Sequence, residues 1–477
     1  MDSIAATSPR NSRAVLIAAL AVGSALHWVL FFGAGRFDMS VSDWPRQTAY
    51  FGVLREAVRT ARLPLETSEP VFEMGTRVFA NLAAPLSPQL WLFVLAGNHM
   101  AALLNAVFMS WIGVYGCLRL ARRLDLSTVS LTAMTLLLGV NGYVVAHVGA
   151  GHYAWLACAL LPFWIEAMLL LSSTPSDSRR VEVAAGAVLF AMFLQGAIHI
   201  ALISAGLLVL AATFTAALRG PALRVLAWGA GLSAIRLVPA AFGFVLARWR
   251  AVIWEGYSSP LRVLEGLLVL RSPRDYVPTG AIQVFGDHAP YGLPVHEFDV
   301  YIGIFGTIVV ALFGIAPIAR RLGPVPAAES WFAPWQVPLL LLALLSCWRF
   351  YGALVPARVG WLTVERVPSR FLGIALAFVV VMACSRFDAW WRSQPRSAGE
   401  QAFLWGAIAM LGAQLLYHSW TFSPARSDAF AVTLSPIAPT IAGASSSAYV
   451  AGIVIGALVT VVSAGAAWVV TRPSPAA

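Results

Sequence analysis

The sequence predicts an all-α, polytopic membrane protein with about twelve transmembrane helices, and three observations lead to this class. Of the 477 residues, 59% are hydrophobic and only 11% are charged, and the mean hydropathy is +0.76. Apolar runs of roughly 20 residues, the length that crosses a bilayer, recur along the chain. Arginines collect at alternate turns between these runs, as expected for cytoplasmic turns. The composition therefore excludes a large soluble domain.

The order of apolar runs and arginines predicts the topology. The first span is expected at 14–33, with Arg10 and Arg13 before it in the cytoplasm. This places a first outer loop at 35–89 and a second large outer loop at 248–299. The further spans are expected at 90–118, 128–148, 154–171, as a pair within 183–218, and at 225–246, 300–318, 334–347, 371–384, 402–418 and 449–470. Both termini then lie in the cytoplasm. We divide the chain into a catalytic membrane module, 1–320, and a C-terminal membrane module, 321–477.

The first outer loop contains the pattern of an amphipathic helix. Its apolar positions recur at helical spacing, and the polar ones take the opposite face. The apolar face consists of Tyr50, Val53, Leu54, Ala57, Val58 and Ala61, and the polar face of Thr48, Arg55, Arg59 and Arg62. Pro45 suits the first helical turn, and Leu63-Pro64 suits the end. Such a helix is expected to lie along the membrane surface.

Asp43 and Asp38 precede this helix and are the candidate catalytic residues. A carboxylate at the boundary of water and lipid can accept a proton from an acceptor hydroxyl while a lipid-borne substrate arrives sideways. The alternative for Asp43 is that its side chain caps the helix that begins near Pro45, because acids are favoured at helix N-termini. Glu56, in the same helix, is added as a candidate substrate-binding residue.

Arg236 lies close to the middle of the expected span 225–246. An arginine at the centre of a span costs at least ~2.5 kcal/mol and must face a cavity or a partner. Two partners are open: an internal acid such as Glu166, or the phosphate of a substrate lipid.

His147, His152 and His199 lie at outer turns. They can bind a metal ion or relay protons, or they can make ordinary hydrogen bonds at the interface. The four cysteines, by contrast, have neither metal-ligand nor redox spacing, so no disulfide and no metal–thiolate site is expected.

A group of arginines on the outer side runs against the cytoplasmic bias: Arg349, Arg358, Arg366 and Arg370. The planar guanidinium group binds phosphate through several donors at once, so a diphosphate or phosphodiester head group would suit them. The alternative is salt bridges with Glu365 or Glu297.

Nucleic-acid and nucleotide chemistry are not indicated. The formal charge of +10 is spread over many short loops instead of forming one basic patch. The chain has no P-loop, no dinucleotide glycine motif, no His-Glu-x-x-His and no nucleophile elbow.

The chain resembles the polyprenyl-phosphate-dependent glycosyltransferases of the GT-C superfamily, and within them the YfhO-like bacterial membrane proteins. The resemblance rests on a short N-terminus followed by one span and a long outer loop with early acids and a surface helix. Short matching segments add to it: Gly151-His152, Ile235-Arg236-Leu237-Val238-Pro239, Tyr301-Ile302-Gly303 and Arg366-Val-Pro-Ser-Arg370-Phe371.

The resemblance implies an inverting transfer of a sugar from a polyprenyl-phosphate donor to a lipid, glycan or protein acceptor. The reaction would take place on the outer face of the bacterial inner membrane. Asp43 would be the base, and Arg236, Arg366 and Arg370 would contact the donor phosphate, with His152 as a further substrate-binding residue. Many relatives carry two adjacent acids where this chain has Asp43-Trp44, which leaves open whether a divalent metal ion takes part.

Two other functions compete with this one. A flippase or other transporter of lipid-linked sugars would use Arg236 to hold a moving anion. A polymerase or ligase of outer-face polysaccharide would depend more on the second large outer loop, for example on Arg271 and Arg274.

Overall fold

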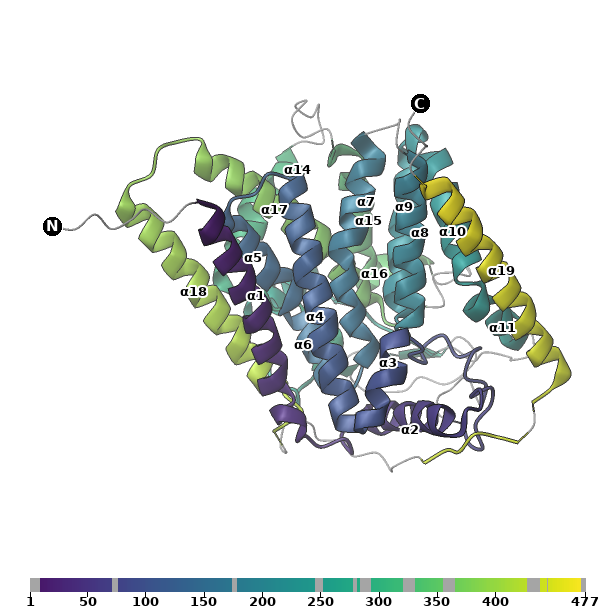
Figure 1. Ribbon diagram of the computed structural model, residues 1–477. Coiled ribbons are helices and arrows are strands. Elements are labelled where there is room, and N and C mark those ends of the chain that lie inside the picture. Colours follow the sequence, from purple (N-terminus) through teal and green to yellow (C-terminus); the bar gives the residue numbers. More distant parts are fainter. Residues whose placement is uncertain are drawn as a thin grey trace.

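The structure is a computed structural model that describes residues 9–70, 76–173, 178–244, 252–277, 281–283, 293–320, 331–354, 365–426, 438–443 and 445–472. Most of these residues are helical. Long helices form one bundle, and α1 begins at the same end of it as α19 finishes (Figure 1).

Each expected span coincides with helical structure, but several spans are broken into two pieces. The unbroken helices are α1 (Pro9–Phe31), α8 (Ser178–Leu194), α9 (Ile198–Phe214), α15 (Ala333–Leu345), α17 (Phe371–Arg392), α18 (Ala398–Thr421) and α19 (Ser447–Thr471). The interrupted ones are α3 (Pro88–Phe93) with α4 (Asn98–Arg123), α5 (Thr128–Gly139) with α6 (Gly142–Gly149), η3 (Tyr153–Leu160) with α7 (Leu161–Ser173), α10 (Arg219–Leu232) with α11 (Ala234–Phe244), and α13 (Gly303–Val309), η6 (Val310–Ile315) and α14 (Ala316–Arg320).

Within the described residues, seven helical segments are long and apolar enough to cross a membrane, or up to eight if the bent pair of α10 and α11 is one span. The two helices of that pair meet at an angle of 80°. Helices α9 and α15 are apolar but shorter. The structure therefore supports a helical protein with several apolar spans, and the count of twelve remains a prediction.

The amphipathic helix expected in the first outer loop is present as α2 (Trp44–Thr60). It lies across the end of the bundle opposite to the start of α1 (Figure 1). Pro45 occupies its first turn, and Ala61 ends it in a left-handed conformation with φ of 51°. Its apolar side packs into the protein, where Tyr50, Phe51 and Leu54 are at most 2% exposed. A helix is therefore present where the spacing predicts one, and protein covers most of its apolar face, whereas Ala61 is exposed. The position of α2 on the membrane surface stays a prediction.

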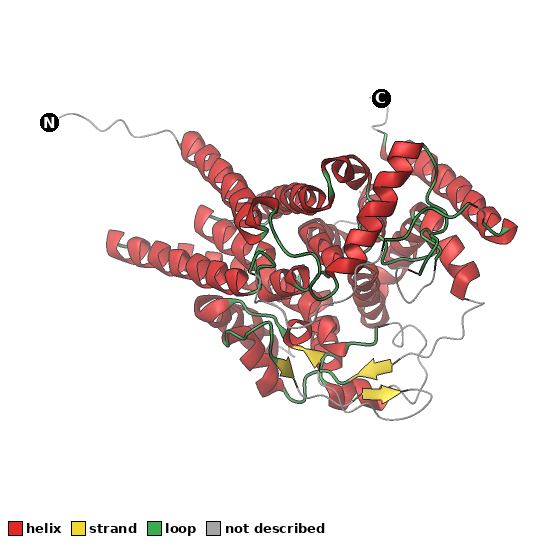
Figure 2. Cartoon of the chain, turned by 90° about the horizontal axis from the view of Figure 1, so that it is seen from below, coloured by secondary structure: helices red, strands yellow, loops and turns green. Residues whose placement is uncertain are grey.

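The expectation of an all-α chain needs a small correction, because two pairs of short antiparallel strands occur in the second large outer segment. β1 (Val252–Trp254) pairs with β3 (Ala281–Gln283), and β2 (Tyr276–Val277) pairs with β4 (Leu293–Pro294). Figure 2 looks onto the end of the bundle that carries α2 and shows both pairs there. Prolines and polar residues prevent a long helix in this segment, so short extended stretches satisfy each other's backbone groups instead. Residues 245–251, 278–280 and 284–292 of the expected loop lie outside the described residues.

The two expected modules pack against each other within this bundle. Helix α5 contacts α17, α9 contacts α15, and α11 contacts α19. The division at residue 320 stays a prediction. Between the described helices, one hydrophobic core extends across both parts of the chain.

Candidate active site

The start of α2 is fixed by the turn between α6 and η3. The Asp43 backbone NH donates to the Ala150 carbonyl at 3.1 Å, and the Trp44 indole NH donates to the Gly149 carbonyl at 2.9 Å. Gly151 has a φ of +87°, and a Cβ there would lie 2.5 Å from the Trp44 nitrogen. Only glycine combines this conformation with so close an approach of two backbones. The turn thereby brings His152 beside Asp43.

The Asp43 carboxylate contacts two basic side chains, His152 and Arg46. Its Oδ2 lies 2.9 Å from His152 Nε2, and its Oδ1 accepts from Arg46 Nη1 at 3.1 Å. Asp43 holds the N-cap position of α2, but its side chain makes no capping hydrogen bond, so the capping alternative is wrong. Burial raises the pKa of Asp43. The hydrogen bond from His152 and the positive charges of His152 and Arg46 lower the pKa by more than burial raises it, so the pKa is about 2. Asp43 is therefore ionised at neutral pH.

His152 begins a cluster of three histidines and one glutamate. His147 Nδ1 and His152 Nδ1 are 2.8 Å apart, and the two rings stack with centroids 5.0 Å apart. His296 and Glu297, from the short helix η5 (Val295–Phe298), complete the cluster. One ligand atom from each of the four residues lies within 4.8 Å of the others, so this group can hold a metal ion.

Glu297 connects this cluster to Arg370. The guanidinium group donates to both Glu297 oxygens, at 2.8 and 2.6 Å, and to Glu365 at 3.4 Å. It also lies over the Trp155 ring at 5.0 Å. The predicted salt-bridge alternative is confirmed for Arg370. Its donors face carboxylates of the protein, and the side chain is only 7% exposed.

Glu365 continues the network to the start of α9. His199 Nδ1 lies 2.7 Å from Glu365 Oε2. Burial raises the pKa of Glu365, but His199 and Arg370 together outweigh it and leave the pKa below its ordinary value. We call this set the outer network: Asp43, His152, His147, His296, Glu297, Arg370, Glu365 and His199. It joins five segments that are far apart in sequence.

Arg236 lies in a different environment. It is fully buried, and it donates to the backbone carbonyls of Ala84 at 3.0 Å and Asn81 at 2.5 Å. Its Nε has no hydrogen-bond partner among the described residues. The predicted pair with Glu166 is wrong, because Glu166 binds Arg119 at 3.0 Å instead. Arg236 thus holds the backbone of the first outer loop.

The remaining candidates lie outside the outer network. Asp38 is exposed and accepts from the backbone NH and hydroxyl of Ser40, at 2.7 and 2.6 Å, in a local turn. Glu56 accepts from the backbone NH of Ile441 at 3.1 Å, and it lies roughly 20 Å along α2 from Asp43 at 1.5 Å per residue.

Arg366 is half-buried, and its carbonyl accepts from the Trp254 NH at 2.8 Å, next to strand β1. Arg358 lies outside the described residues. Of the candidate site residues, the structure therefore brings together Asp43, His152 and Arg370.

His296, Glu297 and Glu365 were missed as site residues. Each lies a few residues before an expected span, His296 and Glu297 before 300–318 and Glu365 before 371–384. An acid or histidine at such a boundary is a usable signal, because charges there must face a partner or a cavity. Glu297 and Glu365 were named from the sequence only as salt-bridge partners of the arginines, and no spacing links His296 and Glu297 to His147 and His152.

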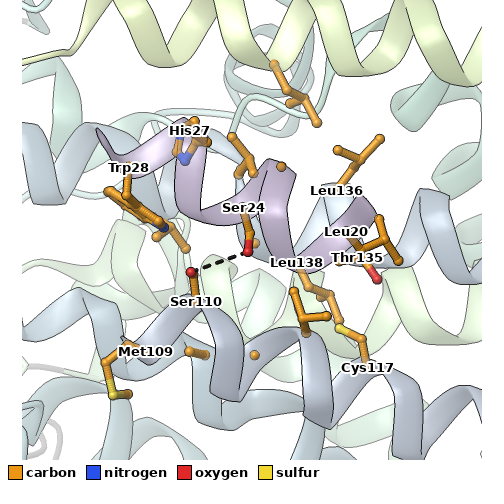
Figure 3. A pocket seen from close by; sticks show the side chains of 18 of the residues that line it. Leu20, Ser24, His27, Trp28, Met109, Ser110, Cys117, Thr135, Leu136 and Leu138 are labelled. Atoms are coloured by element: carbon orange, nitrogen blue, oxygen red, sulfur yellow. Dashed lines mark hydrogen bonds between the residues drawn. The ribbon is translucent and has the colours of Figure 1, made fainter. Parts of the chain in front are cut away.

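An apolar cavity of about 210 Å³ lies between α1, α4, α5, η3 and α18. Its walls include Leu20 and His27 of α1, Cys117 of α4, Leu136 of α5 and Leu416 of α18. Figure 3 shows it with Ser24 and Ser110, whose hydroxyl oxygens are 3.5 Å apart. Leu156 lies in the wall, and its neighbour Trp155 stacks on His147 at 4.2 Å.

Comparisons with known proteins find similarity in structure only. No protein-family model and no curated protein sequence matches the chain. Among solved structures, the chain is similar to the arabinofuranosyltransferase AftD from Mycobacteria, with a TM-score of 0.50 and 16% identity over 86% of this chain. The chain spans only 27% of that protein's length. A weaker similarity, with a TM-score of 0.36 and 14% identity, covers 95% of this chain and 77% of ArnT from Cupriavidus metallidurans, solved with undecaprenyl phosphate.

The similarity to AftD shows a shared fold. The structure itself shows the bundle of apolar helices with α2 across one end, and the GT-C assignment stays a prediction. At this level of identity the activity is a separate question, and it is argued next from the site.

Proposed function

We propose that the protein is a membrane glycosyltransferase that moves a sugar from a polyprenyl-phosphate donor to an acceptor, with inversion and with Asp43 as base. The observation that carries the proposal is the place of Asp43. It is an ionised carboxylate, 27% exposed, at the start of a helix that lies across the end of the bundle. The shared fold with a membrane arabinofuranosyltransferase supports the same class of reaction.

In the proposed reaction, the acceptor oxygen forms a bond to the anomeric carbon on the face opposite the phosphate. The bond between that carbon and the phosphate oxygen breaks, the polyprenyl phosphate leaves, and the hydroxyl proton passes to Asp43. A carboxylate with a pKa of about 2 is a weak base. It suffices here because the transition state resembles an oxocarbenium ion, and the attacking hydroxyl becomes strongly acidic once its oxygen begins to bond to carbon.

The structure changes the roles that we propose for the arginines. Arg370 orients Glu297, since its donors face two carboxylates. Arg236 positions the first outer loop. Asn81 accepts from Arg236 through its carbonyl and donates through its side chain to the Tyr50 hydroxyl of α2. Arg366 remains the candidate contact for the donor phosphate. Glu56 holds the segment around Ile441 and is not proposed to bind substrate.

The apolar cavity supports a lipid-linked donor. Apart from α18, the helical segments that line it are apolar enough to span a membrane, and its lining is mostly apolar. A segment of an isoprenoid chain is the ligand that we propose for it. The isoprenoid would enter the cavity from the bilayer beside α18, where Leu416 is 51% exposed.

The finer topology is also part of the proposal. We propose twelve spans, cytoplasmic termini and an active site on the outer face of the bacterial inner membrane, with the YfhO-like proteins as the nearest group. The support is that α2 lies at the end of the bundle opposite to the start of α1 (Figure 1), and that the network includes Asp43 at the start of α2. Arg10 and Arg13 precede the first apolar run, as expected for a cytoplasmic N-terminus.

Purified protein in proteoliposomes with labelled polyprenyl-phosphate sugars tests the function. Mass spectrometry of the lipid fraction should show free polyprenyl phosphate and a glycosylated acceptor. Relocation of an unchanged donor between leaflets would instead identify a flippase. No change in donor or location with any sugar tested would contradict both functions.

A further inference from the structure

We propose that His147, His152, His296 and Glu297 bind a divalent metal ion of the zinc class. The four residues come from two separate segments: His147 of α6 with His152 of the turn after it, and His296 with Glu297 of the short helix η5. Their ligand atoms lie within 4.8 Å of one another. The inference rests on this geometry alone and does not depend on the proposed glycosyl transfer.

The donor set favours zinc over magnesium or calcium. Imidazole nitrogens with one carboxylate form tetrahedral zinc sites, whereas magnesium and calcium prefer oxygen ligands. Around a tetrahedral ion with bonds of about 2.1 Å, ligand atoms are roughly 3.4 Å apart. The contacts of the Glu297 carboxylate with His147 Nε2, His152 Nδ1 and His296 Nε2 measure 3.9, 4.0 and 3.8 Å, slightly longer than that value.

The residues around the four ligands have the arrangement found around protein-bound zinc. Histidine ligands usually donate their second ring NH to a carboxylate or carbonyl, which fixes the ring and its tautomer. His152 Nε2 does so toward Asp43 at 2.9 Å, so the lone pair of the ring is on Nδ1, which faces His147 and Glu297. Glu297 is held in turn by Arg370 through both carboxylate oxygens.

An unsatisfied atom supplies a second, independent observation. His147 is fully buried, and its Nε2 has no hydrogen-bond partner among the described residues. A buried polar atom without a partner costs about 1–3 kcal/mol. Nε2 lies 3.9 Å from Glu297, inside the cluster, so a metal ion between them would satisfy it.

A bound ion would also change the charge at the candidate active site. Glu297 now faces one arginine and three imidazoles, and the ion would add a fixed positive charge next to His152. Through His152 this charge would act on Asp43, and it would favour an anionic phosphate nearby. Metal binding here does not need the two adjacent acids that many relatives carry in the first loop, because all four proposed ligands come from other segments.

The test measures metal directly in the purified full-length protein. The protein is stripped with a chelator and titrated with Zn²⁺ against a competing indicator, and its metal content is measured by inductively coupled plasma mass spectrometry. We expect about one Zn²⁺ per chain, and at least tenfold weaker binding in His147→Ala and in His296→Ala. The matched control is His199→Ala, which removes a histidine that binds Glu365 outside the set and should leave zinc binding unchanged.

Cobalt substitution keeps the proposal falsifiable if a variant fails to fold. The wild-type protein with Co²⁺ should show the visible absorption bands of a four- or five-coordinate ion with nitrogen and oxygen ligands. Three results would overturn the proposal: no zinc above background in the wild type, equal zinc in His147→Ala and wild type, or a cobalt spectrum of the hexa-aqua ion.

Discussion

Arg370 and Arg236 are both buried arginines near the end of the bundle that carries α2, yet the protein neutralises them differently. Arg370 faces two carboxylates, Glu297 and Glu365. Arg236 binds only backbone carbonyls of the first outer loop. The first arrangement balances charge inside a network of ionisable residues. The second leaves a net positive charge, and the NH groups of Arg236 hold the backbone of the first outer loop. A buried arginine in a span therefore does not by itself indicate a substrate phosphate.

The largest effect should come from breaking the pair at Arg370. Glu297→Gln leaves a buried guanidinium group with one carboxylate in place of two, and removing one member of a buried pair costs about 3–5 kcal/mol. We expect a clear fall in the melting temperature of the purified protein in detergent. The double variant Glu297→Leu/Arg370→Met, which removes both charges, should be less destabilised than Glu297→Gln. An unchanged melting temperature for Glu297→Gln would contradict the pairing.

A smaller effect is expected where the outer network meets α2. Gly151→Ala adds a Cβ that would lie 2.5 Å from the Trp44 nitrogen, in a conformation with φ of +87°. The start of α2 must then move away from His152, so we expect lower transfer activity together with a loss of about 1–3 kcal/mol in stability. Gly97→Ala is the matched control, because Gly97 has a φ of +94° but nothing within 4 Å of its Cβ position. Equal activity in the two variants would show that the contact with Asp43 and Trp44 is unimportant.

The Arg236 site should respond more weakly to loss of charge than the Arg370 site. Arg236→Met removes two hydrogen bonds to the carbonyls of Asn81 and Ala84 and also removes an uncompensated buried charge. The lost bonds cost about 1–3 kcal/mol, and removal of the charge offsets part of that. Limited proteolysis should cut the first outer loop faster in this variant. If Arg236→Met destabilises the protein more than Glu297→Gln does, the comparison between the two arginines fails.

Local patterns predicted the helices well. The 3.6-residue spacing from Tyr50 to Ala61 gave α2, and Pro45 gave its first turn. Apolar runs predicted the positions of helices because length and hydropathy are local properties of the chain. The 80° bend between α10 and α11 was not predictable, since Pro239 lies inside α11 and no proline or charge marks the junction.

The site was predicted only in part. Asp43 and His152 were both assigned to the outer side, but their contact joins positions 109 residues apart, and the close approach at Gly151 creates it. The pairing of Arg370 with Glu297 spans 73 residues and depends on how η5 packs against the start of α17. Such contacts follow from tertiary packing, which no spacing in the sequence encodes.

The most direct test of the account compares Asp43→Asn with Asp38→Asn in the transfer assay. Both changes remove one carboxylate from the first outer loop and keep nearly the same shape, but only Asp43 contacts His152. We expect Asp43→Asn to lower the transfer rate by roughly 10²-fold or more, as for loss of a general base, while the protein elutes as the wild type does in size-exclusion chromatography. Asp38→Asn should stay within about twofold of the wild type, because its carboxylate only stabilises a local turn. Full transfer activity in Asp43→Asn would contradict the central claim.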